Sequence, residues 1–182
     1  MSALRVTTTT DAPAAEQELV SCIEKLGDSS PFIETITSFY WWEGKVQNDE
    51  ERRLSFTTEA ALDTVLEAIG KSHNYDVPMI IAEAIGKSHS SDASSAYWKG
   101  LIAQSDDTGL AERLAASRLV ACAQVAPDGA LAVKTTSKAK AAVEKLAPSV
   151  EWVPIVGNAP YMDWLDAETR EAAEKACEAP AQ

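Results

Sequence analysis

Two glycine-lysine-serine segments are the first candidates for chemistry in this sequence. They lie at residues 70–72 and 86–88, and the longer stretch 68–73 recurs at 84–89. Segments of this kind end the loops that bind nucleotide phosphates through backbone N–H groups and a lysine. The glycine that opens such a loop is missing here, and the first segment is predicted to end a helix, whereas a phosphate loop starts one. The spacing therefore argues against nucleotide binding.

Cysteine, histidine and serine also show no spacing that defines an enzyme. The three cysteines, Cys22, Cys122 and Cys177, are odd in number, lie far apart and form no Cys-x-x-Cys pair. This argues against a disulfide framework and against a structural zinc site, and it favours a reducing compartment. No spacing suggests a catalytic triad, although a triad is a spatial arrangement that any residue order can build. We predict a chain that is not an enzyme.

Four consecutive aromatic residues, Phe39, Tyr40, Trp41 and Trp42, precede the turn-forming pair Glu43-Gly44. Alternate side chains of a strand point to opposite faces, so these rings need cover on both faces of a hairpin. A second subunit can supply this cover and can also pair with the exposed strand edges. The pattern predicts burial between subunits, and the alternative is a surface that stacks sugar rings or nucleobases.

Composition narrows the class of protein. Of the 182 residues, 46% are apolar and 24% are charged, which is typical of a globular protein. The net charge of -12 argues against a nucleic-acid partner, because phosphate contacts require clustered lysine and arginine. We predict no membrane partner, because no apolar run approaches the roughly 20 residues that span a bilayer. The expected location is the cytoplasm, or the interior of an organelle if a targeting segment was removed.

Periodicity predicts the elements that must position these residues, and their order is strand-helix-strand-strand-helix-strand. The aromatic run lies in the first strand of a long hairpin that turns at residues 43–44. The predicted elements of the first half are strands at 4–9, 31–42, 45–57 and 77–84, with helices at 12–26 and between Thr58 and Gly70.

The same order then begins again, with a shorter hairpin turning at residues 128–129. The predicted elements of the second half are strands at 97–103, 119–125, 131–136 and 150–156, with helices at 110–119, at 139–146 and from Pro160. The predicted fold class is α+β: two fused ferredoxin-like (βαββαβ) units, each with an antiparallel sheet and helices on one face. We place the first unit at residues 1–93 and the second, shortened unit with its C-terminal helix at 94–182, joined by a linker at 85–95. The alternative is that two unrelated strand-helix segments look alike.

Motifs in both halves resemble the CutA family of divalent-ion tolerance proteins. Residues 38–45 match a Ser-x-Tyr-x-Trp-x-Gly-Lys hairpin, and residues 73–78 match a His-x-Tyr-x-x-Pro segment. The second half resembles other parts of the family pattern, at 119–124, 134–136 and 161–165. The resemblance implies a tandem duplication with a degenerate second copy and a function in divalent metal-ion (copper) tolerance or binding.

The family's trimers, in which long hairpins pair across subunit edges, imply how this chain assembles. A homo-oligomer is expected, and a trimer is its expected stoichiometry. The implied oligomer interface comprises Tyr40, Trp41, Trp42, Gly44, Lys45, Tyr75 and Pro78.

The resemblance implies an incomplete metal site. Family members with a proposed copper site use a cysteine in the first strand and a histidine pair before the tyrosine. The corresponding residues here are Thr7, Ala103, and Ser72 beside His73. Copper prefers thiolate and imidazole ligands, so His73 and Cys122 are the candidate ligands for copper or another divalent cation. The alternatives are that His73 fixes the start of a strand and that Cys122 is a small buried apolar residue.

Two other functions remain open. One is a small-molecule signalling module like the PII proteins, which share the ferredoxin-like trimer and bind ligands between subunits. Its candidate ligand cleft comprises Lys134, Thr135 and Trp164. The other is a structural scaffold whose second copy blocks further association.

Overall fold

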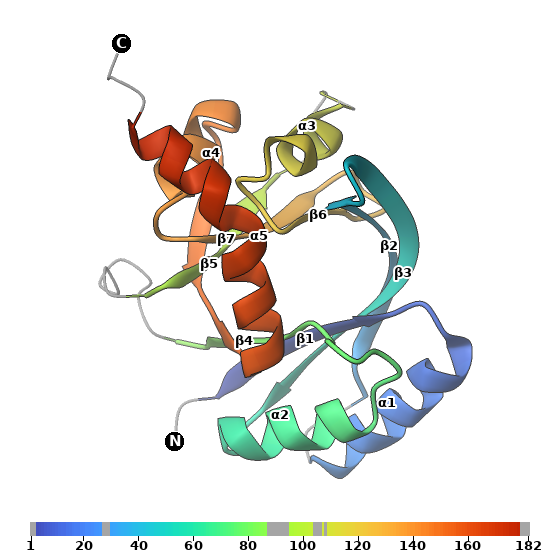
Figure 1. The fold of residues 1–182 in the computed structure, drawn as a ribbon. Helices are drawn as coiled ribbons and strands as arrows, with labels where there is room; N and C mark the ends of the chain where they lie inside the picture. Colours follow the sequence, from blue (N-terminus) through green and yellow to red (C-terminus); the bar gives the residue numbers. More distant parts are fainter. Residues whose placement is uncertain (1–2, 27–29, 87–94, 104–106, 108, 179–182) are drawn as a thin grey trace. The chain divides into compact units, whose positions relative to one another are not determined.

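The computed structural model describes residues 3–26, 30–86, 95–103, 107 and 109–178 of the chain (Figure 1). This part is a mixed α/β fold of helices and antiparallel strands. The elements are β1 Leu4–Thr10, α1 Pro13–Lys25, β2 Phe32–Trp42, β3 Lys45–Thr58, α2 Leu62–Lys71, β4 Ile80–Ala84, β5 Tyr97–Ile102, α3 Leu110–Ser117, β6 Cys122–Val125, β7 Leu131–Thr136, α4 Lys140–Leu146, β8 Glu151–Pro154, β9 Val156–Gly157 and α5 Ala159–Glu178.

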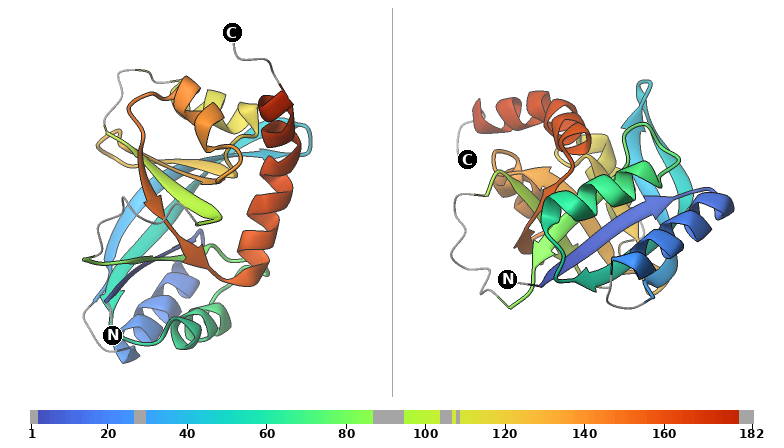
Figure 2. Two further views of the ribbon diagram at one scale, coloured as in Figure 1. Left: turned by 90° about the vertical axis from the view of Figure 1, so that its left-hand side faces the viewer. Right: turned by 90° about the horizontal axis from the view of Figure 1, so that it is seen from below.

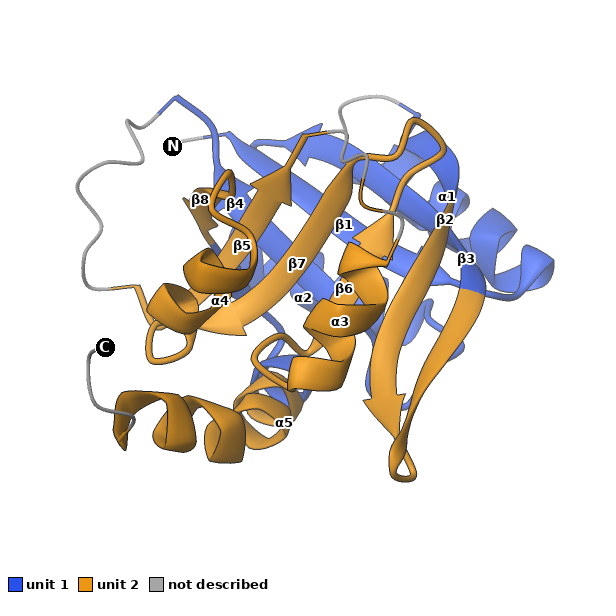
Figure 3. Ribbon diagram, turned by 90° about the horizontal axis from the view of Figure 1, so that it is seen from above, with its two compact units in different colours: residues 1–35, 50–88, 155–162 blue, residues 36–49, 89–154, 163–182 orange. Residues whose placement is uncertain are grey.

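Internal contacts divide the chain into two compact units (Figure 3). Unit 1 comprises residues 1–35, 50–88 and 155–162, and unit 2 comprises 36–49, 89–154 and 163–182. Each unit therefore includes a segment from the other half of the sequence. The division into domains 1–93 and 94–182 stays a prediction, and residues 87–94 of the predicted linker lie outside the described part of the chain.

In unit 1, α1 and α2 lie side by side on one face of the strands (Figure 2). Leu19 and Ile23 of α1 are four residues apart, as are Val65 and Ile69 of α2, so each pair lies on one face of its helix. These four side chains are buried in one cluster with Val6 of β1. The predicted helices and their apolar faces are confirmed.

The strands of unit 1 follow the order β2-β3-β1-β4-β9. Val6 of β1 lies opposite Phe56 of β3 on one side and opposite Ala82 of β4 on the other, so the helix-covered face is apolar across three strands. The first four strands of the chain thus have the spatial order 4-1-3-2, which is that of a ferredoxin-like sheet.

Thr8 on β1 is a polar exception on this apolar face. Its side chain is fully buried, and its hydroxyl has no hydrogen-bond partner within the described residues. Removing an unsatisfied hydroxyl is favourable, so Thr8→Val is expected to raise the free energy of unfolding by about 1 kcal/mol and the melting temperature by about 2–4 °C. Differential scanning calorimetry measures both quantities. Thr10→Val is the matched control, since it breaks the 2.8 Å bond from the Thr10 hydroxyl to Asn74, and it should destabilise.

The strands with residues in unit 2 follow the order β8-β5-β7-β6-β2-β3, in which the second-half strands again have the order 4-1-3-2. α3 and α4 cover one face of β5, β7 and β6 (Figure 3). Leu114 of α3, Val143 of α4, Ala123 of β6 and Val133 of β7 are fully buried in the core of this face, and Phe39 of β2 packs against it.

The strand predicted at 150–156 is wrong as a single element. The chain forms β8 at Glu151–Pro154, passes through the buried Ile155, and then forms β9 at Val156–Gly157. β8 pairs with β5 in unit 2, whereas β9 pairs with β4 in unit 1. The two short strands thus pair with different partners, and sequence periodicity does not encode this pairing.

Candidate functional site

The predicted ligand His73 lies in the loop after α2, where both ring nitrogens take part in hydrogen bonds. Nε2 donates to the carbonyl oxygen of Thr9 at 2.8 Å, and the backbone N–H of Tyr75 donates to Nδ1 at 3.1 Å. The His73 and Tyr75 rings are 5.0 Å apart at their centroids. A metal ion at His73 would have to displace one of these partners.

The neighbours of His73 hold the same loop to the end of β1. Asn74 accepts a hydrogen bond from the Thr10 hydroxyl and donates one of 3.0 Å to Asp11. The Tyr75 hydroxyl donates to Glu51 at 3.3 Å. Burial, together with the carboxylates of Glu51 and Asp11, raises the pKa of the Tyr75 phenol well above its usual value. Tyr75 therefore stays protonated and acts as a hydrogen-bond donor here.

Burial also makes the His73 loop sensitive to pH. It lowers the pKa of the His73 imidazole below its ordinary value, although the Thr9 carbonyl and Asp11 oppose this change. The stability that the neutral imidazole contributes is fully present above the pKa of His73 in the unfolded chain. It is lost as the pH falls through the pKa of His73 in the folded protein. The free energy of unfolding of the wild type is therefore expected to decrease as the pH falls below about 6.5, the ordinary pKa of histidine. Urea unfolding of His73→Gln should show a flatter pH dependence, and parallel curves would contradict the role of His73.

The second predicted ligand, Cys122, is buried on β6 in unit 2. It lies opposite Tyr40 on β2 and opposite Lys134 on β7. Lys134 is 1% exposed, and its ammonium donates to the side-chain carbonyl of Gln124. Within the described residues, no group of three or more histidine, cysteine, aspartate or glutamate side chains is placed to hold a metal ion. A site at His73 or at Cys122 stays a prediction.

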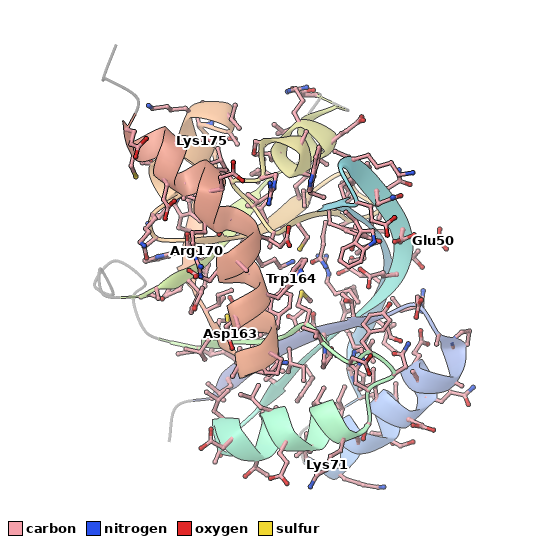
Figure 4. The ribbon with its side chains drawn as sticks, in the orientation of Figure 1. Glu50, Lys71, Asp163, Trp164, Arg170 and Lys175 are labelled. Atoms are coloured by element: carbon pink, nitrogen blue, oxygen red, sulfur yellow. The ribbon has the colours of Figure 1, made fainter. Side chains whose placement is uncertain are left out.

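Two of the three residues of the predicted ligand cleft lie side by side on β7, and the cleft stays a prediction. Lys134 and Thr135 are consecutive on β7, so their side chains point to opposite faces, and both are buried. The Thr135 hydroxyl donates to the carbonyl oxygen of Leu119 at 2.5 Å. Trp164 is half-buried on α5 (Figure 4).

The hairpin residues of the predicted interface differ in exposure. Gly44 at the turn has a φ of +82°, a left-handed conformation that suits glycine, and it is exposed together with Lys45. Trp42 is 52% exposed and Trp41 is half-buried. The half-buried Tyr40 donates its hydroxyl hydrogen to Asp49. Among these residues, Trp42 is the large apolar side chain left most open to solvent.

Pro78 is buried and is held by Asn158, a residue that sequence reasoning missed. The Asn158 side chain donates to the Pro78 carbonyl at 3.0 Å and accepts from the Ile80 N–H at 3.1 Å. The Asn158 N–H also donates to the Ile80 carbonyl at 3.2 Å. No spacing in the sequence indicates this contact, because it joins positions about 80 residues apart.

A group of one lysine and two indoles in unit 2 was also missed. The ammonium of Lys140, on α4, lies 3.8 Å from the ring centroid of Trp98 and 5.6 Å from that of Trp152. The Trp152 indole N–H donates to Glu144 at 2.7 Å. Cation–π contacts of this kind join α4 to β5 and β8, so the group has a structural role in unit 2.

A groove of about 570 Å³ lies between α1 and α2 in unit 1. Its lining includes Glu18, Cys22 and Lys25 of α1 and Ser72 after α2. It includes none of the predicted metal, interface or cleft residues. In the described part of the chain, no helix is long and apolar enough to cross a membrane.

The hairpin and the His73 loop both lie within a segment that matches a protein-family model. Residues 3–99, more than half of the chain, match the model described as CutA1 divalent ion tolerance protein. The chain belongs to the CutA1 family. The CutA resemblance of the hairpin and His73 motifs is thereby confirmed.

Similar CutA proteins come from plants and from an archaeon. The rice protein named Protein CutA 1, chloroplastic is 47% identical over 60 residues, which are 32% of this chain and 34% of that protein. The divalent-cation tolerance protein CutA of Pyrococcus horikoshii is 30% identical over 100 residues, which are 54% of this chain and 93% of that protein. The alignment spans only about a third of the rice and Arabidopsis CutA proteins. The crystal structure of CutA1 from Oryza sativa matches with a TM-score of 0.43 and 37% identity, over 48% of this chain and 84% of that one.

Proposed function

We propose that this CutA family member is a non-enzymatic protein of divalent metal-ion tolerance, with copper as the first candidate ion. The observation that carries the proposal is the family match, which includes both the hairpin and the His73 loop. The named function of the Pyrococcus relative, divalent-cation tolerance, supports it. We also propose two fused ferredoxin-like units at residues 1–93 and 94–182. The strand order 4-1-3-2, which occurs in each half, supports a duplication.

Isothermal titration calorimetry with copper and zinc tests the ion-binding proposal. The candidate ligands are the His73 imidazole, after displacement of a hydrogen-bond partner, and the Cys122 thiol. Binding tighter than about 1 mM that is weakened by His73→Ala or by Cys122→Ala supports the proposal. Wild-type binding weaker than that limit would remove direct metal binding from the function. A thermal-shift panel with nucleotides on the same samples tests for a small-molecule module, because a ligand of the native state must raise the melting temperature.

Self-association is the second part of the proposal, with a homo-trimer as the stoichiometry. The exposed indole of Trp42 supports self-association. When another subunit covers a large apolar side chain, its burial lowers the free energy of the complex.

Trp42→Ala is therefore expected to reduce association while leaving the fold intact. The lost burial corresponds to about 2 kcal/mol for each covered indole, or about a thirtyfold increase in the dissociation constant. Light scattering across a dilution series measures the mass, and the melting temperature of the dilute protein provides the control for folding. An unchanged mass at every concentration would contradict the role of Trp42.

The compartment is proposed as the cell interior, either the cytoplasm or an organelle. Both plant relatives carry the word chloroplastic in their names, which supports an organelle interior as one of the two locations. Fractionation of cells that express the tagged full-length protein distinguishes the two, and recovery outside the cell would contradict both.

A further inference from the structure

Strands from the second half of the chain occupy two sheet edges of the first half. On β2, Thr37–Tyr40 pair antiparallel with Cys122–Val125 of β6. On β4, Ile81 and Ala82 pair antiparallel with Gly157 and Val156 of β9. Each pairing lies within one compact unit, because the hairpin tip belongs to unit 2 and residues 155–162 belong to unit 1.

The pairing of β9 with β4 is short, and two residues beside it reinforce it. The Asn158 side chain bonds to the backbone on both sides of Met79, through the Pro78 carbonyl and the Ile80 N–H. Gly157 lies so close to β4 that a Cβ atom there would be 2.5 Å from the Ile80 carbonyl oxygen. These contacts hold β9 against β4 although only two residues pair.

Both edges would attract other chains if they were open. An unpaired strand edge presents backbone N–H and C=O groups that add a strand from another molecule. The β4 strand has the sequence Ile80-Ile81-Ala82-Glu83-Ala84, and its first three residues are almost completely buried. An apolar edge of this kind is a strong template for self-association.

We propose that the second half of the chain is a built-in assembly partner. Its strands β6 and β9 fill the edges of β2 and β4 and thereby withhold these edges from a second copy. Copies can then associate only through surfaces that these strands leave open, which include the hairpin turn with Trp42. The outer part of β3 pairs with β2 alone among the described strands, and its exposed charges at Lys45, Asp49 and Glu50 discourage strand addition there.

A cysteine pair tests whether β6 pairs with β2 of its own chain in solution. Thr37 and Val125 are directly opposite, at a Cα separation of about 4.5–5.5 Å that a disulfide can bridge. Thr37→Cys with Val125→Cys, in a background with the native cysteines replaced by alanine, is expected to form a disulfide within one chain upon oxidation. A mixture of the two single variants is expected to give no cross-linked dimer. A dimer band in that mixture, on a non-reducing gel, would show exchange between chains and overturn the proposal.

Asn158→Ala tests whether the filled edge limits association. The variant removes both side-chain bonds to β4 and should open that edge, so its mass by light scattering is expected to rise with concentration to at least twice that of the wild type. Asn74→Ala is the matched control, since it also loses two side-chain hydrogen bonds in unit 1 but lies at no sheet edge. A folded Asn158→Ala protein with the wild-type mass at every concentration would overturn the proposal.

If Asn158→Ala does not fold, the cysteine pair still decides whether β6 pairs with β2 of its own chain. The inference rests on the proposed self-association only for the surfaces that remain open. If the wild type shows no metal affinity, the ion-binding proposal is wrong and the edge-filling proposal still stands. If the single-cysteine variants cross-link between chains, only the edge-filling proposal is wrong.

Discussion

Alanine in place of Gly157 is expected to lower the free energy of unfolding by about 3 kcal/mol. A Cβ atom at this position would lie 2.3 Å from the terminal carbon of Met162 and 2.5 Å from the Ile80 carbonyl oxygen. The methionine can change rotamer, but the carbonyl belongs to the backbone of β4 and cannot move without disturbing its pairing with β1. The cost is therefore expected to fall on the β4–β9 pairing and on the buried residues beneath it.

Gly70→Ala is the matched control for Gly157→Ala. Gly70 lies in α2, and a Cβ atom there would meet only Ile80 Cδ1 at an ordinary 3.9 Å. Because alanine is the better helix former, this variant is expected to be more stable than the wild type by about 0.5–1 kcal/mol. Urea unfolding followed by far-UV circular dichroism measures both variants. Equal midpoints for the two would contradict the close approach of Gly157 to β4.

The local elements could be predicted from the sequence because their signals are local. The alternation and turn residues around 43–44 predicted the long hairpin, and the four-residue spacing of Leu19 and Ile23 predicted a buried helix face. The family followed from the hairpin and His73 motifs, and the match over residues 3–99 confirms it. These features depend on residues close together in the chain.

The pairing of strands that are distant in sequence could not be predicted in the same way. The edge of β2 can form its backbone hydrogen bonds with a strand of another subunit or with β6 of the same chain. The aromatic run therefore predicts that its side chains are covered, but it does not predict which strand or subunit covers them. The structure supplies cover for Phe39 within unit 2. Likewise, the alternation at 150–156 gave no sign that Ile155 separates strands with different partners.

The surroundings of the candidate metal ligands also could not be predicted from the sequence. The residue types of His73 and Cys122 suggested metal ligands, but ligation depends on which atoms remain available. The His73 nitrogens bond to the backbone of Thr9 and Tyr75, and Cys122 lies inside a sheet between Tyr40 and Lys134. Sequence spacing cannot report either environment, since each brings together residues from separate strands or loops.

Trp98→Ala is expected to destabilise the protein by about 4 kcal/mol, because it removes a large buried ring whose space the surrounding side chains cannot refill. Trp98 is only 6% exposed, and its indole N–H donates to the Ser95 carbonyl and the Ser137 hydroxyl, each at 3.1 Å. The ring also supports the Lys140 ammonium, which would keep only the more distant Trp152. Urea unfolding monitored by circular dichroism measures the loss, which is a large share of the roughly 5–15 kcal/mol that stabilises a typical domain.

Two milder variants separate the contributions of Trp98. Trp98→Phe keeps an aromatic face under Lys140 but loses the N–H donor, so it should cost about 1–2 kcal/mol. Lys140→Met keeps the apolar stem and removes the cation, and its expected cost is about 0.5–1 kcal/mol for a partly exposed cation–π contact. From the most to the least stable, the expected order of the three variants is therefore Lys140→Met, Trp98→Phe and Trp98→Ala. If Lys140→Met were the most damaging of the three, the charge rather than the burial of the indole would hold α4 to β5, and the assignment of the ring as the main contributor would be wrong.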